Sequence, residues 1–369
     1  MEIWWITLYT TFFCCLFARI RWIKYINKYS NDYIQKSNRF LVCISVLILI
    51  LVSGLRINVG DTQIYMNKFE EIPSNFSEAI RSSAYISQDK GFYIFSSIIK
   101  TFISENVQIY ILILAAVTII LIYITLYKYT DNLEMAIFIF IAAGNYLVSM
   151  NAVRQYLVSA IIFYCFPLIY KKRWYIYIPI VFLASTLHGS AIIFIPLYFI
   201  INAKAWGKIS KILLFGGILA YIAYPITGSF LAKLLENTNY SVYGDGLISG
   251  VAGASSIIRT LVYAVPIVLA YVKRREIEHE HKYFNIVLNF SIINLIFMLL
   301  SNAASWIFAR YCIYFSLYMI ILLCWCINSF KNIKEKRIIY YLCIVLYSVY
   351  YFYEMHISLK IVYMSNIIK

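Results

Sequence analysis

The chain has 369 residues, of which 62% are hydrophobic and only 13% are charged. A soluble domain carries about 25% charged residues, so this composition excludes a soluble protein and indicates one polytopic membrane domain over residues 1–369. The net charge of +15 lies in short Lys/Arg clusters between apolar stretches. Such placement is typical of cytoplasmic loops that contact membrane lipids, and it argues against nucleic acid as a partner.

Apolar stretches of membrane-spanning length recur along the whole chain. They predict an all-α integral membrane protein with about twelve transmembrane helices. The expected spans are residues 3–19, 40–55, 107–127, 135–150, 154–170, 174–187, 189–202, 209–226, 258–272, 283–301, 306–328 and 338–355. Alternating their direction places both termini outside and five basic clusters in the cytoplasm, at residues 19–39, 171–173, 204–211, 273–282 and 331–337.

Two long loops, 56–106 and 227–257, are extracytoplasmic in this arrangement. Residues 56–92 and 227–257 each carry one more acidic than basic residue, so neither has the Lys/Arg excess of an inside loop. Within the first loop, residues 91–103 form an amphipathic stretch that is too short to span, and we expect it to lie along the outer surface or to re-enter it. The second loop contains Gly244, Gly246, Gly250 and Gly253 and is either a mobile gate or, as we favour, a plain flexible loop.

One stretch, residues 174–202, permits two topologies. It is either one long tilted helix or a hairpin of two short helices that meet near His188-Gly189. A single helix would place the Lys204–Lys211 cluster outside, against the positive-inside rule. We therefore expect a hairpin with His188 at its outer tip.

Five cationic side chains interrupt the apolar blocks, and the predicted topology places all of them on the outer side: Arg56, Arg154, His188, Arg259 and Arg310. A cation inside a spanning helix costs roughly 2.5–3.5 kcal/mol, so its presence suggests a function. Several cations on one side indicate a pocket for an anion, such as a phosphate- or diphosphate-bearing lipid. The alternative for each arginine is an interfacial anchor that contacts lipid headgroups.

Arg154 lies in Asn151-Ala-Val-Arg154-Gln155-Tyr156, a short outer turn that opens the next span. A guanidinium near a helix N-terminus can hold phosphate oxygens together with backbone N–H groups. Its planar fork binds a diphosphate bidentately, which a lysine ammonium cannot do. These features favour an anion-binding role for Arg154.

His188 is the only histidine inside an apolar block. It is either a core histidine satisfied by a hydroxyl such as that of Ser185, or a general base among the outer cations, and we favour the base. Asp61, just beyond Arg56, is either a salt-bridge partner of that arginine or a turn residue.

We expect neither a metal nor another cofactor. His279 and His281 are two positions apart and do not share a helix face. All eight cysteines fall within apolar segments, where cysteine behaves as a small hydrophobic residue. The chain also lacks a P-loop, a zinc-protease motif and the Asp-x-Asp pair of metal-dependent nucleotide-sugar enzymes.

Several short sequence pieces occur in order along the chain: Gly54-Leu-Arg56 with Gly60-Asp61 and Tyr65, Gly91-Phe92, Arg154-Gln155-Tyr156, Leu183-Ala184 with His188-Gly189-Ser190 and Ile195-Pro196, and Arg310-Tyr311. In these pieces, spread over residues 55–311, the chain resembles the EpsG-like polymerases and the wider Wzy-type O-antigen and capsule polymerases. The ordered set, rather than any one piece, carries the resemblance.

The resemblance implies a glycosyltransferase of GT-C-like architecture in the bacterial cell inner membrane. Members of the family move an undecaprenyl-diphosphate-linked glycan onto another lipid-linked repeat unit on the outer side of that membrane, in O-antigen, lipopolysaccharide or capsule biosynthesis. The implied partners are these glycan substrates, membrane lipids, a chain-length regulator and a flippase.

By position, the resemblance assigns diphosphate binding to four arginines, Arg56, Arg154, Arg259 and Arg310. It implies that His188 or Asp61 deprotonates the acceptor hydroxyl. It also assigns substrate positioning to Gln155, Tyr65 and Tyr311. A polyprenyl diphosphate leaves readily once arginine holds its charge, which fits electrostatic catalysis without a metal.

Two other functions fit the composition. A flippase for lipid-linked oligosaccharides would carry basic residues on both sides and along the depth of its chamber, whereas here they collect at the outer level. A membrane O-acyltransferase would need a buried histidine open to an acyl donor inside the cell, whereas His188 is placed outside. The sequence therefore favours the polymerase.

Overall fold

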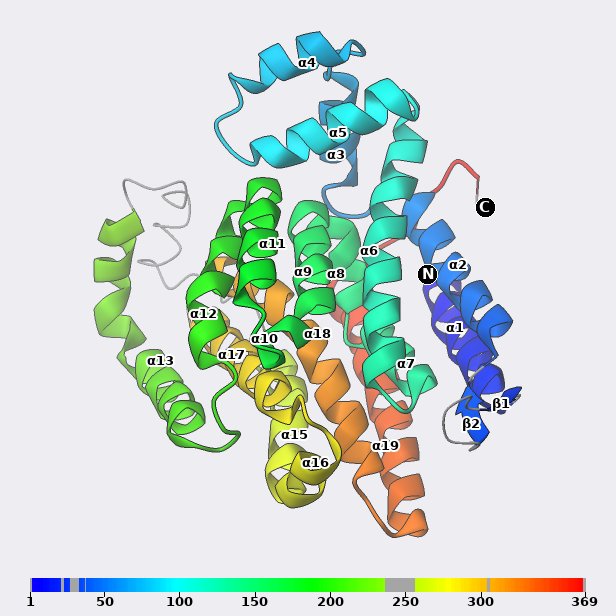
Figure 1. Ribbon diagram of the computed structural model, residues 1–369, viewed down its shortest axis with the longest axis vertical. Coiled ribbons are helices and arrows are strands. Elements are labelled where there is room, and N and C mark those ends of the chain that lie inside the picture. Colours follow the sequence, from blue (N-terminus) through cyan, green and yellow to red (C-terminus); the bar gives the residue numbers. More distant parts are fainter. Residues whose placement is uncertain are drawn as a thin grey trace. The chain divides into compact units, whose positions relative to one another are not determined.

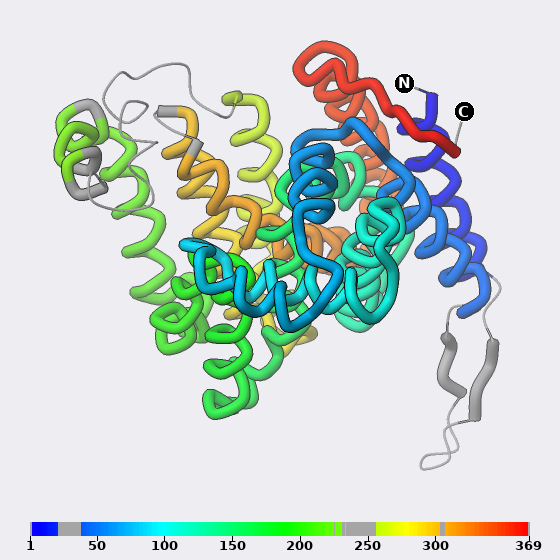
Figure 2. The backbone as a smooth tube through the Cα atoms, turned by 90° about the horizontal axis from the view of Figure 1, so that it is seen from above, coloured from blue at the N-terminus to red at the C-terminus, as the bar shows by residue number. Residues whose placement is uncertain are grey.

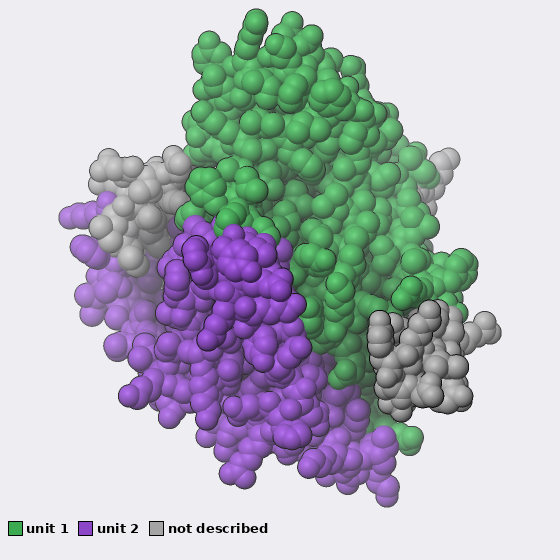
Figure 3. All heavy atoms as spheres, viewed as in Figure 1, with its two compact units in different colours: residues 1–164, 179–192, 337–369 green, residues 165–178, 193–336 purple. Residues whose placement is uncertain are grey.

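The computed structural model describes residues 2–20, 23–26, 33–36, 38–235, 256–303 and 306–367. Helices dominate this part of the chain, which confirms the predicted helical class. The exception is one antiparallel hairpin of two strands, β1 (Ile23–Ile26) and β2 (Tyr33–Lys36). Both strands are short and contain the isoleucine and tyrosine residues that favour extended structure. The chain divides into two compact units, which have different colours in Figure 3.

Unit 1 comprises Met1–Tyr164, Pro179–Ile192 and Arg337–Lys369. Its helices are α1 (Glu2–Ile20), α2 (Arg39–Gly54), α3 (Thr62–Glu70), α4 (Phe76–Ser83), α5 (Lys90–Phe102), α6 (Val107–Tyr129), α7 (Leu133–Ala142), α8 (Asn145–Asn151), most of α9 (Val153–Cys165), the second part of α11 (Trp174–Leu187), most of the 3-10 helix η1 (Gly189–Ile193), most of α19 (Ile333–Phe352) and the π-helical turn η3 (Tyr353–Ser358). Within the unit, α1 packs against α2 and α7, and α2 packs against α6 (Figure 1).

Asparagine side chains start several of these helices. The side-chain oxygens of Asn38, Asn75 and Asn106 accept hydrogen bonds from first-turn N–H groups of α2, α4 and α6. Such caps satisfy donors that have no partner inside the helix, and each contributes about 1 kcal/mol. The predicted loop 56–106 folds largely as three short helices, α3 to α5, of which α4 has such a cap. Its amphipathic stretch forms α5, as the pattern predicts.

Of the helices in this loop, α3 and α5 pack beside α6, and α4 packs on α5 (Figure 1). The Phe69 ring of α3 stacks on the Tyr110 ring of α6, with centroids 4.1 Å apart. Lys100 of α5 is buried and donates from Nζ to the last carbonyls of α3, Phe69 O at 3.1 Å and Glu70 O at 2.8 Å. A cation at a helix C-terminus is favourable. Lys100 therefore ties α5 to α3.

Contacts between distant parts of the chain hold together both ends of helix α1 in unit 1. At the C-terminal end of α1, Arg19 Nη1 pairs with Glu134 Oε1 at 2.5 Å, and the Tyr340 hydroxyl donates to the same oxygen at 3.1 Å. This joins α1, α7 and α19 at the predicted cytoplasmic end, where pairing makes the buried Glu134 tolerable. At the N-terminal end of α1, Trp4 Nε1 donates to Ile361 O at 3.2 Å, so the chain termini lie side by side (Figure 2).

Unit 2 comprises Cys165–Ile178 and Ile193–Lys336. Its helices are α10 (Pro167–Tyr170), the first part of α11, α12 (Phe194–Ile200), α13 (Lys208–Leu235), α15 (Ile257–Val272), α16 (Arg274–Glu280), α17 (Phe284–Ala303) and α18 (Trp306–Asn328). Helix α17 packs along α18, and α13 and α15 pack against α17. Stacked rings of Phe290, Phe297 and Phe315 fill the interface between α17 and α18.

The stretch 174–202 is a hairpin, as predicted. The rings of Tyr177 and Tyr198 have centroids 5.4 Å apart. In one straight helix these positions would be about 30 Å apart, at about 1.5 Å per residue. The chain therefore reverses between α11 and α12, and His188 stands at the reversal, between the last residue of α11 and the first residue of η1.

Six helical segments in the described part of the chain are long and apolar enough to cross a membrane: Glu2–Ile20, Val107–Tyr129, Val153–Tyr170, Phe284–Asn302, Ile307–Asn328 and Ile333–Ser358. A seventh span results if α7 and α8, which meet at 55°, count as one. Gly144 separates them with φ +83°, a conformation that L side chains rarely adopt. Shorter apolar helices coincide with four further predicted spans: Arg39–Gly54, Trp174–Leu187, Gly189–Ile200 and Ile257–Val272. The chain is therefore a multi-pass membrane protein.

The second predicted loop begins later than expected. Helix α13 continues to Leu235, whereas the predicted span ends at residue 226. Its 28 residues extend about 42 Å, which exceeds the roughly 30 Å of a bilayer's hydrocarbon core. Residues 227–235 are thus helical, and residues 236–255, which include Gly244, Gly246, Gly250 and Gly253, lie outside the described residues.

Candidate functional site

Three segments of unit 1 meet at the carboxylate of Asp89. Arg154 Nη1, from the first turn of α9, lies 2.8 Å from Asp89 Oδ2. His188 Nδ1, from the turn after α11, lies 3.3 Å from the same oxygen. The backbone N–H of Gly189 donates to Asp89 Oδ1 at 3.0 Å. The structure thus brings together Arg154 and His188, two of the residues predicted to act, through an acid that the sequence reasoning did not single out.

The conformation of Asp89 explains how it reaches both partners. Asp89 precedes α5 in the left-handed region, with φ 53° and ψ 41°, and its side chain makes no capping bond to that helix. Aspartate and asparagine tolerate this region better than other non-glycine residues. The carboxylate is therefore directed away from α5 and toward the turn at His188.

Neighbouring aromatic residues hold Arg154 in place, and part of its side chain remains exposed. Its guanidinium carbon lies 5.9 Å from the Tyr65 ring centroid and 5.8 Å from the Phe92 ring centroid. The backbone N–H of Arg154 donates to the Tyr65 hydroxyl at 3.4 Å. A third of the Arg154 side chain (33%) and a fifth of the His188 side chain (20%) remain exposed. Both side chains are therefore held in place and can still be reached by a ligand.

The charge of Asp89 is set by competing effects. Burial raises the pKa of its carboxyl, but the hydrogen bond and charge of His188, the charge of Arg154 and the Gly189 N–H together hold that pKa below its ordinary value. Asp89 is therefore an anion at neutral pH. Its partners stabilise the folded protein at neutral pH, and this contribution is lost only when acid protonates the carboxyl below that ordinary value.

Arg56 occupies a different place from the one predicted for a ligand. It is 2% exposed, and it donates from Nε to Thr62 Oγ1 at 2.8 Å and from Nη2 to Met150 O at 2.9 Å. Nη1 donates to Ser53 O. These bonds join the last turns of α2 and α8, where a cation is favourable. In this conformation Arg56 supports the turn that leads to Arg154, and its diphosphate-binding role stays a prediction.

Asp61 also packs against that turn. Its backbone N–H donates to Asn151 Oδ1 at 3.0 Å, and a Cβ built on the preceding Gly60 would overlap the same amide. In the part of the chain that the structure describes, Asp61 and Arg56 form no ion pair, so that interpretation of Asp61 is wrong. The motif Arg56…Gly60-Asp61…Tyr65 thus lines the turn from Asn151 to Arg154. The role of Asp61 as a base stays a prediction.

The other predicted residues are distributed over both units. Gln155 and Tyr65 are buried in unit 1. Arg259 lies in the first turn of α15, where Ser256 Oγ accepts from its backbone N–H at 3.3 Å. Arg310 is exposed on α18, next to Tyr311. These last three belong to unit 2, so the convergence of Arg259, Arg310 and Tyr311 with Arg154 stays a prediction.

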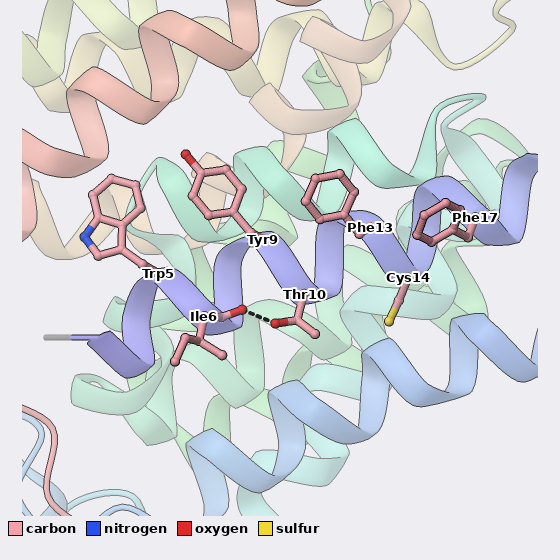
Figure 4. Close-up of a pocket in the computed structure, with 7 residues that line it drawn as sticks. All are labelled: Trp5, Ile6, Tyr9, Thr10, Phe13, Cys14 and Phe17. Atoms are coloured by element: carbon pink, nitrogen blue, oxygen red, sulfur yellow. Dashed lines mark hydrogen bonds between the residues drawn. The ribbon is translucent and has the colours of Figure 1, made fainter.

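An apolar groove elsewhere in unit 1 does not fit this chemistry. It runs along α1 and is lined by Trp5, Ile6, Tyr9, Thr10, Phe13, Cys14 and Phe17 (Figure 4). None of these side chains is ionic, and apolar surface on a membrane helix contacts lipid tails. Among the described residues, no three His, Cys, Asp or Glu side chains gather as a metal site, and chemistry without a metal stays a prediction.

Comparison with known families decides the assignment. The model of the EpsG family matches residues 39–368, nearly the whole chain. The chain belongs to the EpsG family. This is a family of Wzy-type polymerases, so membership establishes a glycosyltransferase-like polysaccharide polymerase in general terms. No curated protein and no solved structure matches the chain.

Asp89 is the residue of this EpsG-family site that the sequence analysis missed. It is one of five acidic residues between positions 56 and 92, and only its place two residues before Gly91-Phe92 distinguishes it. Gly91 itself has a structural reason, because a Cβ there would overlap the Thr186 hydroxyl of α11. The close approach of α5 to α11 places Asp89 beside His188.

A first prediction concerns this close approach. Gly91→Ala should force α5 away from α11, at a cost of about 1–3 kcal/mol in folding stability. Because misplacement by about 1 Å can cost about 10²-fold in rate, polymerisation should fall by up to that factor. Thermal unfolding and product length measure the two effects. Gly216→Ala is the matched control, since a Cβ at Gly216 meets no atom within 4 Å. An active, fully stable Gly91→Ala protein would contradict the account.

Proposed function

We propose that this EpsG-family protein polymerises undecaprenyl-diphosphate-linked oligosaccharide repeat units into an O-antigen- or capsule-type polysaccharide at the outer face of the bacterial inner membrane. The supporting observation is the pairing of Arg154 and His188 on one carboxylate, with both side chains partly exposed. An anion-binding fork beside a candidate base is what transfer from a diphosphate requires.

The proposed reaction is a single displacement at the anomeric carbon of the donor. The acceptor hydroxyl forms a new C–O bond to that carbon, and its proton passes to His188. The bond between the anomeric carbon and the diphosphate oxygen breaks, and the lipid diphosphate leaves with the electron pair. Arg154 stabilises the charge that develops on this leaving group, which electrostatic catalysis can accomplish without a metal.

The remaining assignments belong to the same proposal. Arg310, Arg259 and Arg56 would supply further positive charge to the diphosphate, and Asp61 is the second candidate base. Gln155, Tyr65 and Tyr311 would position the substrates. We also propose about twelve crossings in a GT-C-like arrangement, which the six or seven candidate spans and the four shorter apolar helices of the described residues support. A flippase would deliver the repeat units, and a chain-length regulator would limit the product.

The length of the surface polysaccharide in a deletion strain tests the function. A polymerase mutant should display single capping repeats in place of long chains, because repeat units still reach the outer face. A flippase mutant would expose none. Restoration of long chains by the wild-type gene is the positive control. Normal chain length in the deletion strain would contradict the proposal.

The topology gives a second prediction. Reporter fusions at Asn75 and Gly246 should be active only with a periplasmic reporter, because both loops lack an excess of basic residues. Fusions at Lys172 and Lys334 should be active only with a cytoplasmic reporter. Cytoplasmic activity at Gly246 would mean that a segment between the His188 turn and residue 246 does not cross the membrane as proposed.

A further inference from the structure

The proposed reaction assigns no step to Asp89, although its carboxylate contacts Arg154, His188 and Gly189. Oδ2 faces both Arg154 and His188, and Oδ1 accepts from the Gly189 N–H. The side chain is 11% exposed, so substrate has little access to it. A carboxylate in this position acts through its neighbours rather than on the substrate.

The contact with His188 fixes the state of the imidazole. A neutral imidazole carries one N–H, and a carboxylate next to Nδ1 favours the tautomer with the proton on that nitrogen. Nε2 is then left with a lone pair that can accept the proton of an acceptor hydroxyl. The imidazolium that forms is stabilised by the same carboxylate, as in other carboxylate–histidine pairs.

The contact with Arg154 has a second consequence. A diphosphate and Asp89 are alternative anions for the same guanidinium, so a bound diphosphate draws Arg154 away from Oδ2. The Asp89 carboxylate then pairs with His188 alone and stabilises the imidazolium that forms there. Arg154 also interacts with the phenols of Tyr65 and Tyr110.

We propose that Asp89 is the positioning residue of this site: it orients His188 for proton abstraction and holds Arg154 until the donor diphosphate takes its place. The inference rests on the proposed function, because it assigns His188 and Arg154 the roles of base and diphosphate ligand. It makes binding of the donor the event that leaves the Asp89 carboxylate paired with His188 alone.

Asp89→Asn tests the inference, because asparagine tolerates the left-handed backbone, removes the charge and replaces one acceptor oxygen with an NH2 donor. With purified protein and lipid-linked repeat units, kcat should fall roughly 10²-fold, within the range that base catalysis contributes. KM for the donor should stay equal or fall, because Arg154 loses its competing anion. The acidic limb of the pH–rate profile should move to lower pH, because the imidazolium loses its neighbouring carboxylate.

Two further variants complete the comparison. Asp89→Glu keeps the charge and should retain the acidic limb of the wild-type profile with partial activity. Glu78→Gln removes an exposed carboxylate of α4 and should leave rate and profile unchanged. A wild-type rate in Asp89→Asn would overturn the inference. A lower kcat with a raised KM and an unmoved acidic limb would also overturn it, since that result indicates a purely structural bond.

The inference and the proposed function fail in different ways. If the function is wrong, the wild-type protein itself extends no glycan. The inference is then tested by binding of undecaprenyl diphosphate, which Asp89→Asn should bind more tightly than the wild-type protein does. Equal or weaker binding would overturn the exchange of anions at Arg154.

Discussion

Arg154→Lys should nearly abolish polymerisation, although it keeps the positive charge. The guanidinium fork can bind one diphosphate through two N–H groups while it lies beside the rings of Tyr65 and Phe92. A lysine ammonium is a point charge and cannot reproduce that geometry. We expect a loss of about 10²-fold or more, comparable to the removal of one oxyanion-hole donor. The affinity for lipid diphosphate should fall in parallel.

The assay for Arg154→Lys is the chain length of the product, with donor binding measured on the same protein. Arg81→Lys is the matched control, because Arg81 is an exposed arginine of α4 in the same loop. Its product should equal that of the wild type. Long-chain product from Arg154→Lys would mean that the arginine is an interfacial anchor, since an anchor tolerates lysine.

His188→Ala should abolish extension while leaving donor binding nearly intact. Base catalysis typically contributes about 10²–10⁴-fold, and alanine offers no acceptor for the proton of the hydroxyl. Binding should persist because Arg154 and its aromatic neighbours are unchanged. The two substitutions are therefore separated by one comparison: Arg154→Lys loses affinity, and His188→Ala loses rate.

His279→Ala serves as the control for His188→Ala, since His279 is exposed on α16 in a predicted cytoplasmic loop. It should have wild-type activity. If His188→Ala lowers only the amount of protein in the membrane, with normal rate per molecule, His188 is a structural histidine of the α11–α12 turn. Asp61 would then become the candidate base.

Hydrophobic periodicity and charge placement predict the helices well, because apolar length and the positive-inside rule act on each segment separately. The hairpin at His188 followed from the position of Lys204–Lys211 alone, and the contact between Tyr177 and Tyr198 confirms it. The bend between α7 and α8 could not be located in the same way. It depends on the left-handed conformation of Gly144, which a glycine allows and does not require.

The candidate site could be predicted only in part. Arg154 and His188 are conspicuous because each interrupts an apolar block. Asp89 gives no such signal, since an acidic residue in a polar loop is ordinary and its partners come from α9 and the α11 turn. The sequence gives no signal for the burial of Arg56 either, because the Met150 carbonyl that accepts its hydrogen bond is far away in sequence. Tertiary contacts decide both cases.

Extension of lipid-linked repeat units by the purified protein is the most direct test of the central claim. Given undecaprenyl-diphosphate-linked repeats, with a chelator present, the wild-type protein should produce a ladder of longer glycans. It should release one lipid diphosphate for each new linkage, and His188→Ala protein should do neither. Folded wild-type protein that binds these repeats and leaves them unextended, with or without added divalent metal, would contradict the account.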